Sequence, residues 1–282
     1  MSNAVKFYLV DLESKFKKIN RKKYFLSYSG GKDSHFLYWF IKEYLHDTEI
    51  EIVGVNTYME HHEILERINK NCDRVLLPAM KPMQIKEKYG IPCFSKFQDE
   101  IISRYQKGSR TKNTMDAITG EGRITFKLNK KARDLTLSDQ LHKVSNKCCK
   151  VIKKDTMKAY EKESGKKAII GVRSSESIMR KAKYTTCFTK DRNFTPIHDL
   201  SDELLEEIIQ EYNIEVPSVY KHINRTGCMG CPYGHRSGNT ERELALINEN
   251  QKKFVCEYFK ESYEVLGINT DIQKQITIDD YL

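Results

Sequence analysis

Six residues near the start of the sequence have the types and the spacing of a phosphate-binding turn. They are Ser29, Gly30, Gly31, Lys32, Asp33 and Ser34. An apolar run at 24–28 precedes them and a helical pattern at 35–44 follows, so a strand leads through a glycine turn into a helix. This arrangement directs backbone N–H groups and the positive helix end at an anion. The glycines let the anion approach closely, the serines add donors and Lys32 adds charge. The spacing differs from that of a Walker A loop.

Four of the eight cysteines form a second group of residues that could bind a metal or take part in chemistry. Cys148 and Cys149 are adjacent, Cys228 and Cys231 form a Cys-Met-Gly-Cys segment, and 78 residues lie between Cys149 and Cys228. Two adjacent thiolates reach different irons of a four-iron four-sulfur cluster more easily than two corners of one zinc site. We therefore expect a cluster, with a zinc site and unmetallated thiols as the alternatives. The other cysteines are expected to be small buried hydrophobes: Cys72, Cys93, Cys187 and Cys256.

The composition is that of a globular protein, with 39% hydrophobic and 31% charged residues among 282. No window approaches the roughly 18 apolar residues that a membrane span needs. The first residues lack the basic-then-apolar order of a signal peptide, so we expect a cytoplasmic protein. In that reducing compartment, cysteines serve as metal ligands or catalytic thiols more often than as disulfides.

Positive charge is concentrated in one part of the sequence. The net charge is +9, and the segment 104–154 holds fourteen Lys and Arg against four Asp and Glu. Residues about 104–147 are expected to be an insertion. Its charge suits a solvated surface, or a positive wall for a polyphosphate, a sulfonucleotide or a nucleic-acid backbone.

Apolar runs and helical patterns alternate along much of the sequence. Strands are expected at 24–28, 50–55, 74–77 and 167–172, with helical patterns at 5–19, 35–44, 60–70, 83–88, 174–183, 202–212 and 240–263. This alternation predicts an α/β fold whose doubly wound, mostly parallel sheet is covered on both faces. Ligands bind such sheets beyond the carboxyl ends of the strands, where the glycine turn lies. We expect a leading amphipathic helix at 1–23, a nucleotide-binding α/β domain at 24–200 and a helical, cysteine-bearing region at 201–282.

With these motifs in place, the sequence resembles the phosphoadenosine phosphosulfate (PAPS) reductase family of the PP-loop adenine-nucleotide α-hydrolase-like superfamily, in its iron–sulfur-type, uncharacterised bacterial and phage branch. Val55-Asn56-Thr57 with Glu60 resembles the motif after the second strand, whose backbone reads adenine. Residues 171–177 with Arg180 resemble the Gly-x-Arg-x-x-Glu-Ser segment, whose arginine binds the anionic end of the nucleotide. The planar fork of an arginine suits that role.

The resemblance implies a full set of site residues. Nucleotide contacts are expected from Ser29, Gly30, Gly31, Lys32, Asp33, Ser34, Val55, Asn56, Thr57, Glu60, Gly171, Arg173, Glu176 and Arg180. Catalytic roles fall to Lys32 and Arg173, and cluster ligation to Cys148, Cys149, Cys228 and Cys231. The expected cofactors are a four-iron four-sulfur cluster and ATP or another adenine nucleotide, which magnesium can accompany. A nucleic acid at the 104–154 segment and a redox or sulfur-donor protein are further candidate partners.

These features predict a PAPS-reductase-like enzyme that acts at the α-phosphate or at an attached sulfate, by adenylyl or sulfur transfer. The alternatives are an ATP-using, cluster-dependent thiolation or phosphorothioation enzyme acting on nucleic acid, and a non-catalytic nucleotide and cluster sensor. Reductases of the family carry a nucleophilic cysteine in a C-terminal Glu-Cys-Gly-Leu-His motif, whereas the last cysteine here is Cys256, in a helical pattern. We therefore expect little release of sulfite from PAPS.

Overall fold

The computed structural model describes residues 2–121, 127–176, 178–223 and 226–271, which form two compact units. The α/β unit consists of Met1–Asn56, His62–Leu77 and Asp155–Lys221. The cysteine unit consists of Thr57–His61, Pro78–Lys154 and His222–Leu282. The domain bounds expected from the sequence stay a prediction, and the tail at 273–282 lies outside the described residues.

A parallel sheet forms the centre of the α/β unit. Its strands are β1 (Tyr24–Tyr28), β2 (Glu51–Val55), β3 (Arg74–Leu76) and β4 (Lys167–Ile170), in the order β3-β2-β1-β4. Leu26 of β1 lies beside Ile52 and Ile169, and all three strand pairs are parallel. The chain winds outward from β1 to β3 and then returns to β4 on the other side of β1. The predicted α/β class with a doubly wound parallel sheet is therefore confirmed.

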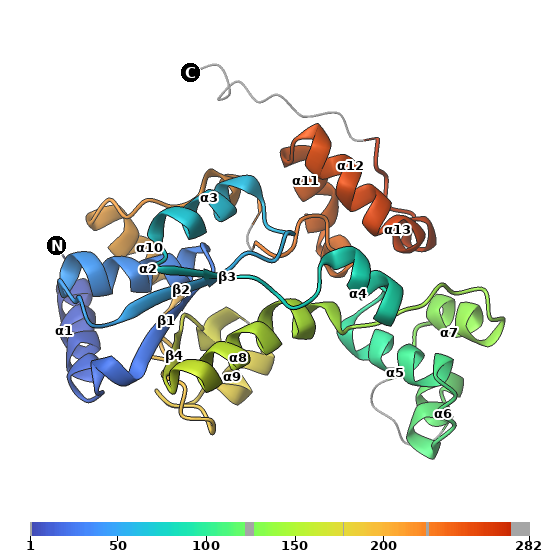
Figure 1. Cartoon of the computed structure of the whole chain (residues 1–282), viewed down its shortest axis with the longest axis horizontal. Helices are drawn as coiled ribbons and strands as arrows, with labels where there is room; N and C mark the ends of the chain where they lie inside the picture. Colours follow the sequence, from blue (N-terminus) through green and yellow to red (C-terminus); the bar gives the residue numbers. More distant parts are fainter. Residues whose placement is uncertain (1, 122–126, 177, 224–225, 272–282) are drawn as a thin grey trace. The chain divides into compact units, whose positions relative to one another are not determined.

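Helices cover both faces of this sheet (Figure 1). They are α1 (Asn3–Lys17), α2 (Lys32–Trp39), α3 (His62–Asn71), α8 (Asp155–Ser164), α9 (Ile178–Lys183) and α10 (Asp202–Glu211). Side chains of successive strand residues point to opposite faces. Phe25 and Val53 accordingly pack against Tyr160 of α8, whereas Tyr28 contacts His35 of α2 and Asn71 of α3.

The helix after the glycine turn changes character along its length. It begins at Lys32, three residues before the start expected from the sequence, and continues beyond Trp39 as a π-helical turn, Phe40–Tyr44. Phe40 packs against Phe16 of α1, which buries Val5 and Leu9 on the same side. The helix that carries the turn is therefore anchored in the core.

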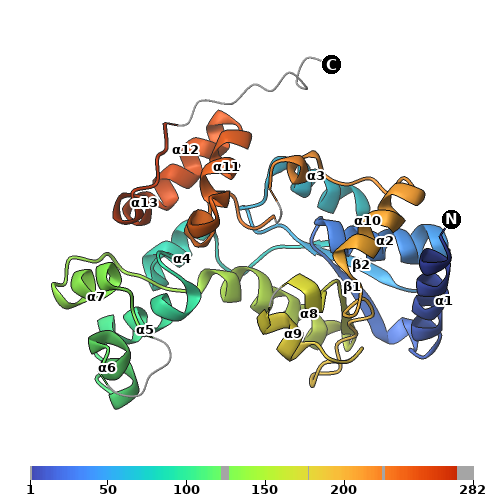
Figure 2. The same ribbon diagram turned by 180° about the vertical axis from the view of Figure 1, so that it is seen from behind.

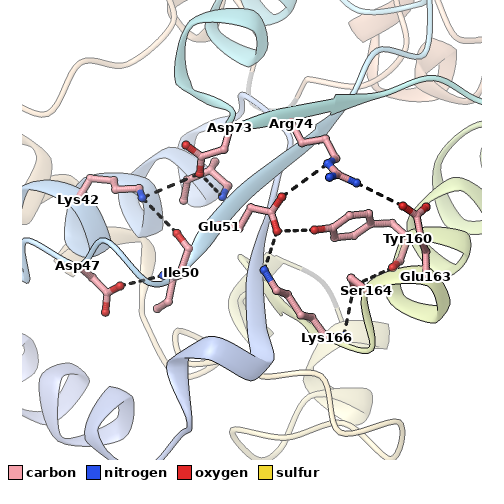
Figure 3. Close-up of polar contacts among 11 residues, drawn as sticks. Lys42, Asp47, Ile50, Glu51, Asp73, Arg74, Tyr160, Glu163, Ser164 and Lys166 are labelled. Atoms are coloured by element: carbon pink, nitrogen blue, oxygen red, sulfur yellow. Dashed lines mark hydrogen bonds and ion pairs between the residues drawn. The ribbon is translucent and has the colours of Figure 1, made fainter.

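A polar network closes the amino ends of the strands, opposite the glycine turn (Figure 3). Glu51, at the start of β2, accepts hydrogen bonds from Lys166 Nζ at 2.7 Å and from the hydroxyl of Tyr160. Arg74 of β3 forms ion pairs with Glu51 and with Glu163 of α8. These contacts tie three strands to one helix.

The cysteine unit is mainly helical. Its helices are α4 (Pro82–Tyr89), α5 (Lys96–Gln106), α6 (Lys112–Thr119), α7 (Lys130–Leu137), α11 (Asn239–Leu246), α12 (Glu249–Tyr258) and α13 (Lys260–Leu266). The predicted insertion contains α6, α7 and only the end of α5 (Figure 2). These three helices surround a core that includes Ile102, Ala117 and Leu128. The single helical pattern expected at 240–263 is divided among α11, α12 and α13. None of the described helices in either unit is long and apolar enough to cross a membrane.

A buried histidine connects α2 to the sheet. His35 Nδ1 lies 2.9 Å from the hydroxyl of Tyr28, and Asn71 Nδ2 donates to the same hydroxyl at 2.9 Å. The Tyr28 hydroxyl, which accepts from Asn71, can donate its own proton to Nδ1 of a neutral His35. Burial, together with the positive charges of Arg67 and Lys70, lowers the pKa of His35 to about 3.

We expect this histidine to make the α/β unit sensitive to acid. Because the pKa of His35 is lower in the folded than in the unfolded chain, the contribution of the neutral ring is complete above about pH 6.5. It is lost as the pH falls towards 3, by up to about 1.4 kcal/mol per pH unit. Urea unfolding at pH 7 and pH 5, followed by the fluorescence of Trp39, the only tryptophan in the sequence, measures this loss. His35→Gln should flatten the pH dependence and His46→Asn, at an exposed position, should keep it. Equal slopes for His35→Gln and the unaltered protein would contradict the assignment.

Candidate nucleotide site and cysteine cluster

The glycine turn lies between the carboxyl end of β1 and the first residue of α2. Ser34 Oγ accepts a hydrogen bond from the backbone N–H of Ser29 at 3.2 Å and lies 3.0 Å from Ser29 Oγ. It donates in turn to the carbonyl of Gly31 at 3.0 Å. The two predicted serines therefore bond to each other and fix the shape of the turn.

Glycine is required at position 30 by the backbone and by a neighbour. Its φ of +73° lies in the left-handed region, and an added Cβ would stand 2.9 Å from Ile64 Cγ2 and from the carbonyl oxygen of Ile64. Gly171, in the turn after β4, also faces a close neighbour, because a Cβ there would lie 3.0 Å from the backbone nitrogen of Ser34. The two predicted turns thus meet at the same edge of the sheet.

This meeting point has a topological cause. β1 has β2 on one side and β4 on the other, so the direction of winding reverses between β1 and β4. In doubly wound sheets the carboxyl ends of the strands at such a reversal open a crevice, where ligands bind. The predicted turn at 29–34 and the predicted segment from Gly171 to Arg173 occupy these two ends.

Arg173 is held against the glycine turn by an ion pair. Its Nε donates to Asp33 Oδ1 at 2.8 Å, and only 4% of the residue is exposed. Burial alone would lower the pKa of Arg173, but its pairing with Asp33 and Asp202 raises it above the ordinary value. The structure therefore brings together two predicted site residues that are 140 positions apart in sequence.

Helix α10 adds two carboxylates that the sequence did not indicate. Asp202 Oδ1 accepts from Arg173 Nη1 at 2.5 Å, and Glu206 Oε1 accepts from Lys32 Nζ at 2.5 Å. The backbone N–H of Lys32, the first of α2, donates to the hydroxyl of Tyr220 at 3.1 Å. No local pattern connects α10 with a turn about 170 residues earlier, which is why sequence reasoning missed these groups.

The predicted motif after the second strand is divided between the units. Val55 ends β2 and Asn56 follows it in the α/β unit, where the Asn56 N–H donates to the Leu76 carbonyl at 3.0 Å. Thr57 and Glu60 belong to the cysteine unit, where Glu60 accepts from the Thr57 N–H at 2.9 Å and lies 3.3 Å from Lys153 Nζ. Glu176 ends a 3₁₀ turn that begins at Ser174, and Arg180 lies on α9. The structure thus places the predicted residues 55–56 and 57–60 in different units.

All four predicted cluster ligands lie in the cysteine unit. The charges of Cys149, Cys228 and Cys231 each raise the pKa of Cys148, so the four thiols are near one another. Cys148 is buried with Ile85 and Ile152, and the other three are partly exposed. The interaction between the two adjacent thiols lowers the pKa of Cys149, although burial opposes the shift, and raises the pKa of Cys148. Burial raises the pKa of Cys228 to about 11 and raises that of Cys231 as well.

The Cys228–Cys231 loop is fixed by hydrogen bonds at its two central residues. Met229 N–H donates to the Met59 carbonyl at 2.7 Å, and Gly230 N–H donates to Glu243 at 3.0 Å. The hydroxyl of Tyr263 donates to the Gly230 carbonyl. Gly230 has a φ of +59°, and a Cβ there would stand 2.4 Å from that hydroxyl. Burial raises the pKa of Glu243 to about 8.

The chemistry of these four donors fits an iron–sulfur cluster. Thiolates are its usual ligands, and the four corners of a cluster spread them further apart than the ligands of one zinc ion. Among the described residues, no group of three or more His, Cys, Asp or Glu side chains is arranged to hold a metal ion, and the cluster stays a prediction. Of the other cysteines, Cys93 is buried as predicted. The same prediction was wrong for three cysteines that are only partly buried: Cys72, Cys187 and Cys256.

The α/β unit thus has the architecture of a doubly wound α/β protein, with a glycine turn where the winding of its sheet reverses. Residues 102–233 match the family model of the phosphoadenosine phosphosulfate reductase domain. The match confirms the resemblance drawn from the motifs. It contains all four candidate cluster cysteines and Arg173, and it begins after the turn at 29–34.

Three solved structures are similar to the chain at low identity. Phosphoadenylyl-sulfate (PAPS) reductase from Candida auris, in a phosphate complex, is 10% identical with a TM-score of 0.44, over 78% of this chain and 87% of its own. NH3-dependent NAD synthetase from Campylobacter jejuni subsp. jejuni NCTC 11168, in complex with a nitrate ion, is 14% identical with a TM-score of 0.37, over 96% and 99%. The U34-tRNA thiolase NcsA from Methanococcus maripaludis, with its [4Fe-4S] cluster, is 13% identical with a TM-score of 0.39, over 98% and 82%. No curated protein matches the sequence.

Proposed function

We propose that the protein is an enzyme of PAPS-reductase type that binds an adenine nucleotide at the turn 29–34 and acts at its α-phosphate or at an attached sulfate. The observation that carries this proposal is the meeting of that turn with Gly171 and Arg173 at the reversal of the sheet. Two cationic side chains, Lys32 and Arg173, then border the crevice where such sheets bind ligands.

The two cations have different roles in this proposal. Lys32 is the first residue of α2, so its ammonium stands at the positive end of that helix, where an anion is favoured. Arg173 is buried and oriented by Asp33, so its guanidinium is preorganised for a second anionic group. Charge that develops on a phosphoryl or sulfonyl oxygen would be stabilised by both groups. The backbone at Val55 and Asn56 is the proposed contact for adenine.

The proposal also includes a four-iron four-sulfur cluster on Cys148, Cys149, Cys228 and Cys231. When bound, such a cluster supplies electron transfer or an iron site for sulfur. The protein contributes two fixed segments. The Cys228–Cys231 loop is held by Met59 and Glu243, and the Cys148–Cys149 pair is packed beside Ile85 and Ile152.

A nucleic-acid-modifying enzyme is the second candidate function. Exposed cations of the cysteine unit favour it: Arg104, Lys107, Arg110, Lys112, Lys127, Lys130, Lys131, Lys143, Lys147, Lys150 and Lys154. Such side chains can neutralise phosphates, and binding to them weakens steeply with salt. Cleavage of ATP to AMP and pyrophosphate that requires added nucleic acid would place this function first.

Nucleotide binding at the glycine turn is tested by Lys32→Met. We expect ATP to bind the unaltered protein, and the substitution to weaken binding by about tenfold to a hundredfold, because one charge-assisted hydrogen bond is lost. The matched control is Lys22→Met, at an exposed surface ion pair with Glu49 near the amino end of β1. Isothermal titration calorimetry with ATP and magnesium measures all three proteins. The proposal fails if ATP does not bind the unaltered protein, or binds Lys32→Met equally well.

A further inference from the structure

Both cations proposed to hold the nucleotide are already paired with carboxylates of one helix. Asp202 is 2.5 Å from Arg173, and Glu206 is 2.5 Å from Lys32. Residues four positions apart lie on the same face of a helix. One face of α10 therefore presents two negative charges to the two groups that an anionic ligand would need.

The two carboxylate partners of Arg173 differ in their exposure. Asp33 bonds the Nε edge, and its side chain is only 18% exposed. Asp202 bonds the Nη1 edge, and its side chain is 59% exposed. Asp33 can therefore keep the guanidinium in place while Asp202 moves into water at little cost in solvation. Glu206 is similarly placed, with 50% of its side chain exposed.

The net charge around the two cations favours the replacement of Asp202 and Glu206 by an anionic ligand. Lys32 and Arg173 are outnumbered by three carboxylates, so these five side chains carry a net charge of −1. When Asp202 and Glu206 turn away, the remaining three carry +1. An anion that displaces both carboxylates therefore enters a positive site, whereas an anion that displaces neither meets repulsion.

We propose that Asp202 and Glu206 are displaceable counter-ions, which pair with the anion-binding groups and compete with the nucleotide for them. This inference rests on the proposed nucleotide site. It adds that α10 sets the affinity of that site, and that a ligand must present two anionic groups, one to Lys32 and one to Arg173, to release both carboxylates.

The test is the affinity for ATP when the competing charges are removed. Asp202→Asn and Glu206→Gln should each tighten binding by up to about fivefold, and the double variant by on the order of tenfold, since exposed ion pairs have small individual effects. The control is Glu207→Gln, which removes the same charge from the same helix without touching either ion pair, and its affinity should stay within about twofold. Calorimetric titrations use the whole chain and one magnesium concentration throughout.

A double-mutant cycle shows whether the effect passes through Lys32. In the Lys32→Met background, Glu206→Gln should leave the affinity for ATP unchanged, because Glu206 then has no ammonium group for which it competes with ATP. If the variant that carries both Asp202→Asn and Glu206→Gln binds ATP no more tightly than the unaltered protein, the counter-ion role is overturned and the nucleotide site stands. Absence of binding by every variant overturns both.

Discussion

Protein purified without oxygen is expected to be brown and to hold about four irons per chain, because thiolate-bound iron–sulfur clusters absorb visible light. Two pairs of thiols are available for it in one unit. Cys148 and Cys149 lie beside an apolar core, and Cys228 and Cys231 end a loop whose central residues are fixed by hydrogen bonds. The measurement is iron content together with the visible absorption spectrum.

Substitutions separate this cluster from adventitious iron. Cys228→Ala removes one of the four thiolates and should abolish both the colour and the iron. Cys256→Ala is the matched control, because Cys256 is a partly exposed residue of α12 that packs against the neighbouring core. Its variant should keep the colour. A colourless protein with one tightly bound zinc would show that the cluster assignment is wrong.

Gly90→Ala is expected to have the largest effect on stability, lowering the free energy of unfolding by more than about 4 kcal/mol. Gly90 has a φ of +91°, and a Cβ there would stand 2.0 Å from the carbonyl oxygen of Lys143. That carbonyl accepts the N–H of Ile91 at 3.0 Å, and the Ser145 N–H donates to the Ile91 carbonyl at 2.9 Å. Relief of the clash must therefore separate the two segments, one of which leads into Cys148.

Gly108→Ala provides the control for backbone strain alone. Gly108 has a φ of +86° in the same unit, and nothing lies within 4 Å of a Cβ built there. Its substitution should lower the free energy of unfolding only by the strain of a side chain in the left-handed conformation, about 1–2 kcal/mol. Urea unfolding followed by circular dichroism compares the variants. Equal losses for Gly90→Ala and Gly108→Ala would mean that the clash with Lys143 is absorbed without breaking the pairing.

Much of the fold could be predicted because its signals are local. The strand 24–28 was predicted with the bounds that the structure gives, and three further strands were predicted to within two residues at each end. A buried parallel strand is a short apolar run, so composition over a few residues suffices to find it. The left-handed conformation of Gly30 is likewise a local property, and it was signalled by the adjacent glycines.

The basic segment shows where local signals fall short. Its charge and its glycines indicated an insertion, but α6 and α7 form around apolar residues that are spaced among lysines and arginines. The amphipathic spacing in these eight-residue helices is too short to stand out. Burial against a shared core, which needs the whole segment, stabilises them.

Local patterns along the sequence were enough to predict the parallel α/β class, the resemblance to the PAPS reductase family and the candidate chemistry of a glycine turn and four cysteines. Tertiary structure decided which of these groups meet. It joined Arg173 to Asp33 across 140 positions, placed α10 carboxylates on both candidate phosphate-binding cations, and assigned Asn56 and Thr57 to different units. The physical reason is that an ion pair depends on the separation of two charges in space, and the separation of distant residues is set by the winding of the sheet rather than by any pattern along the chain.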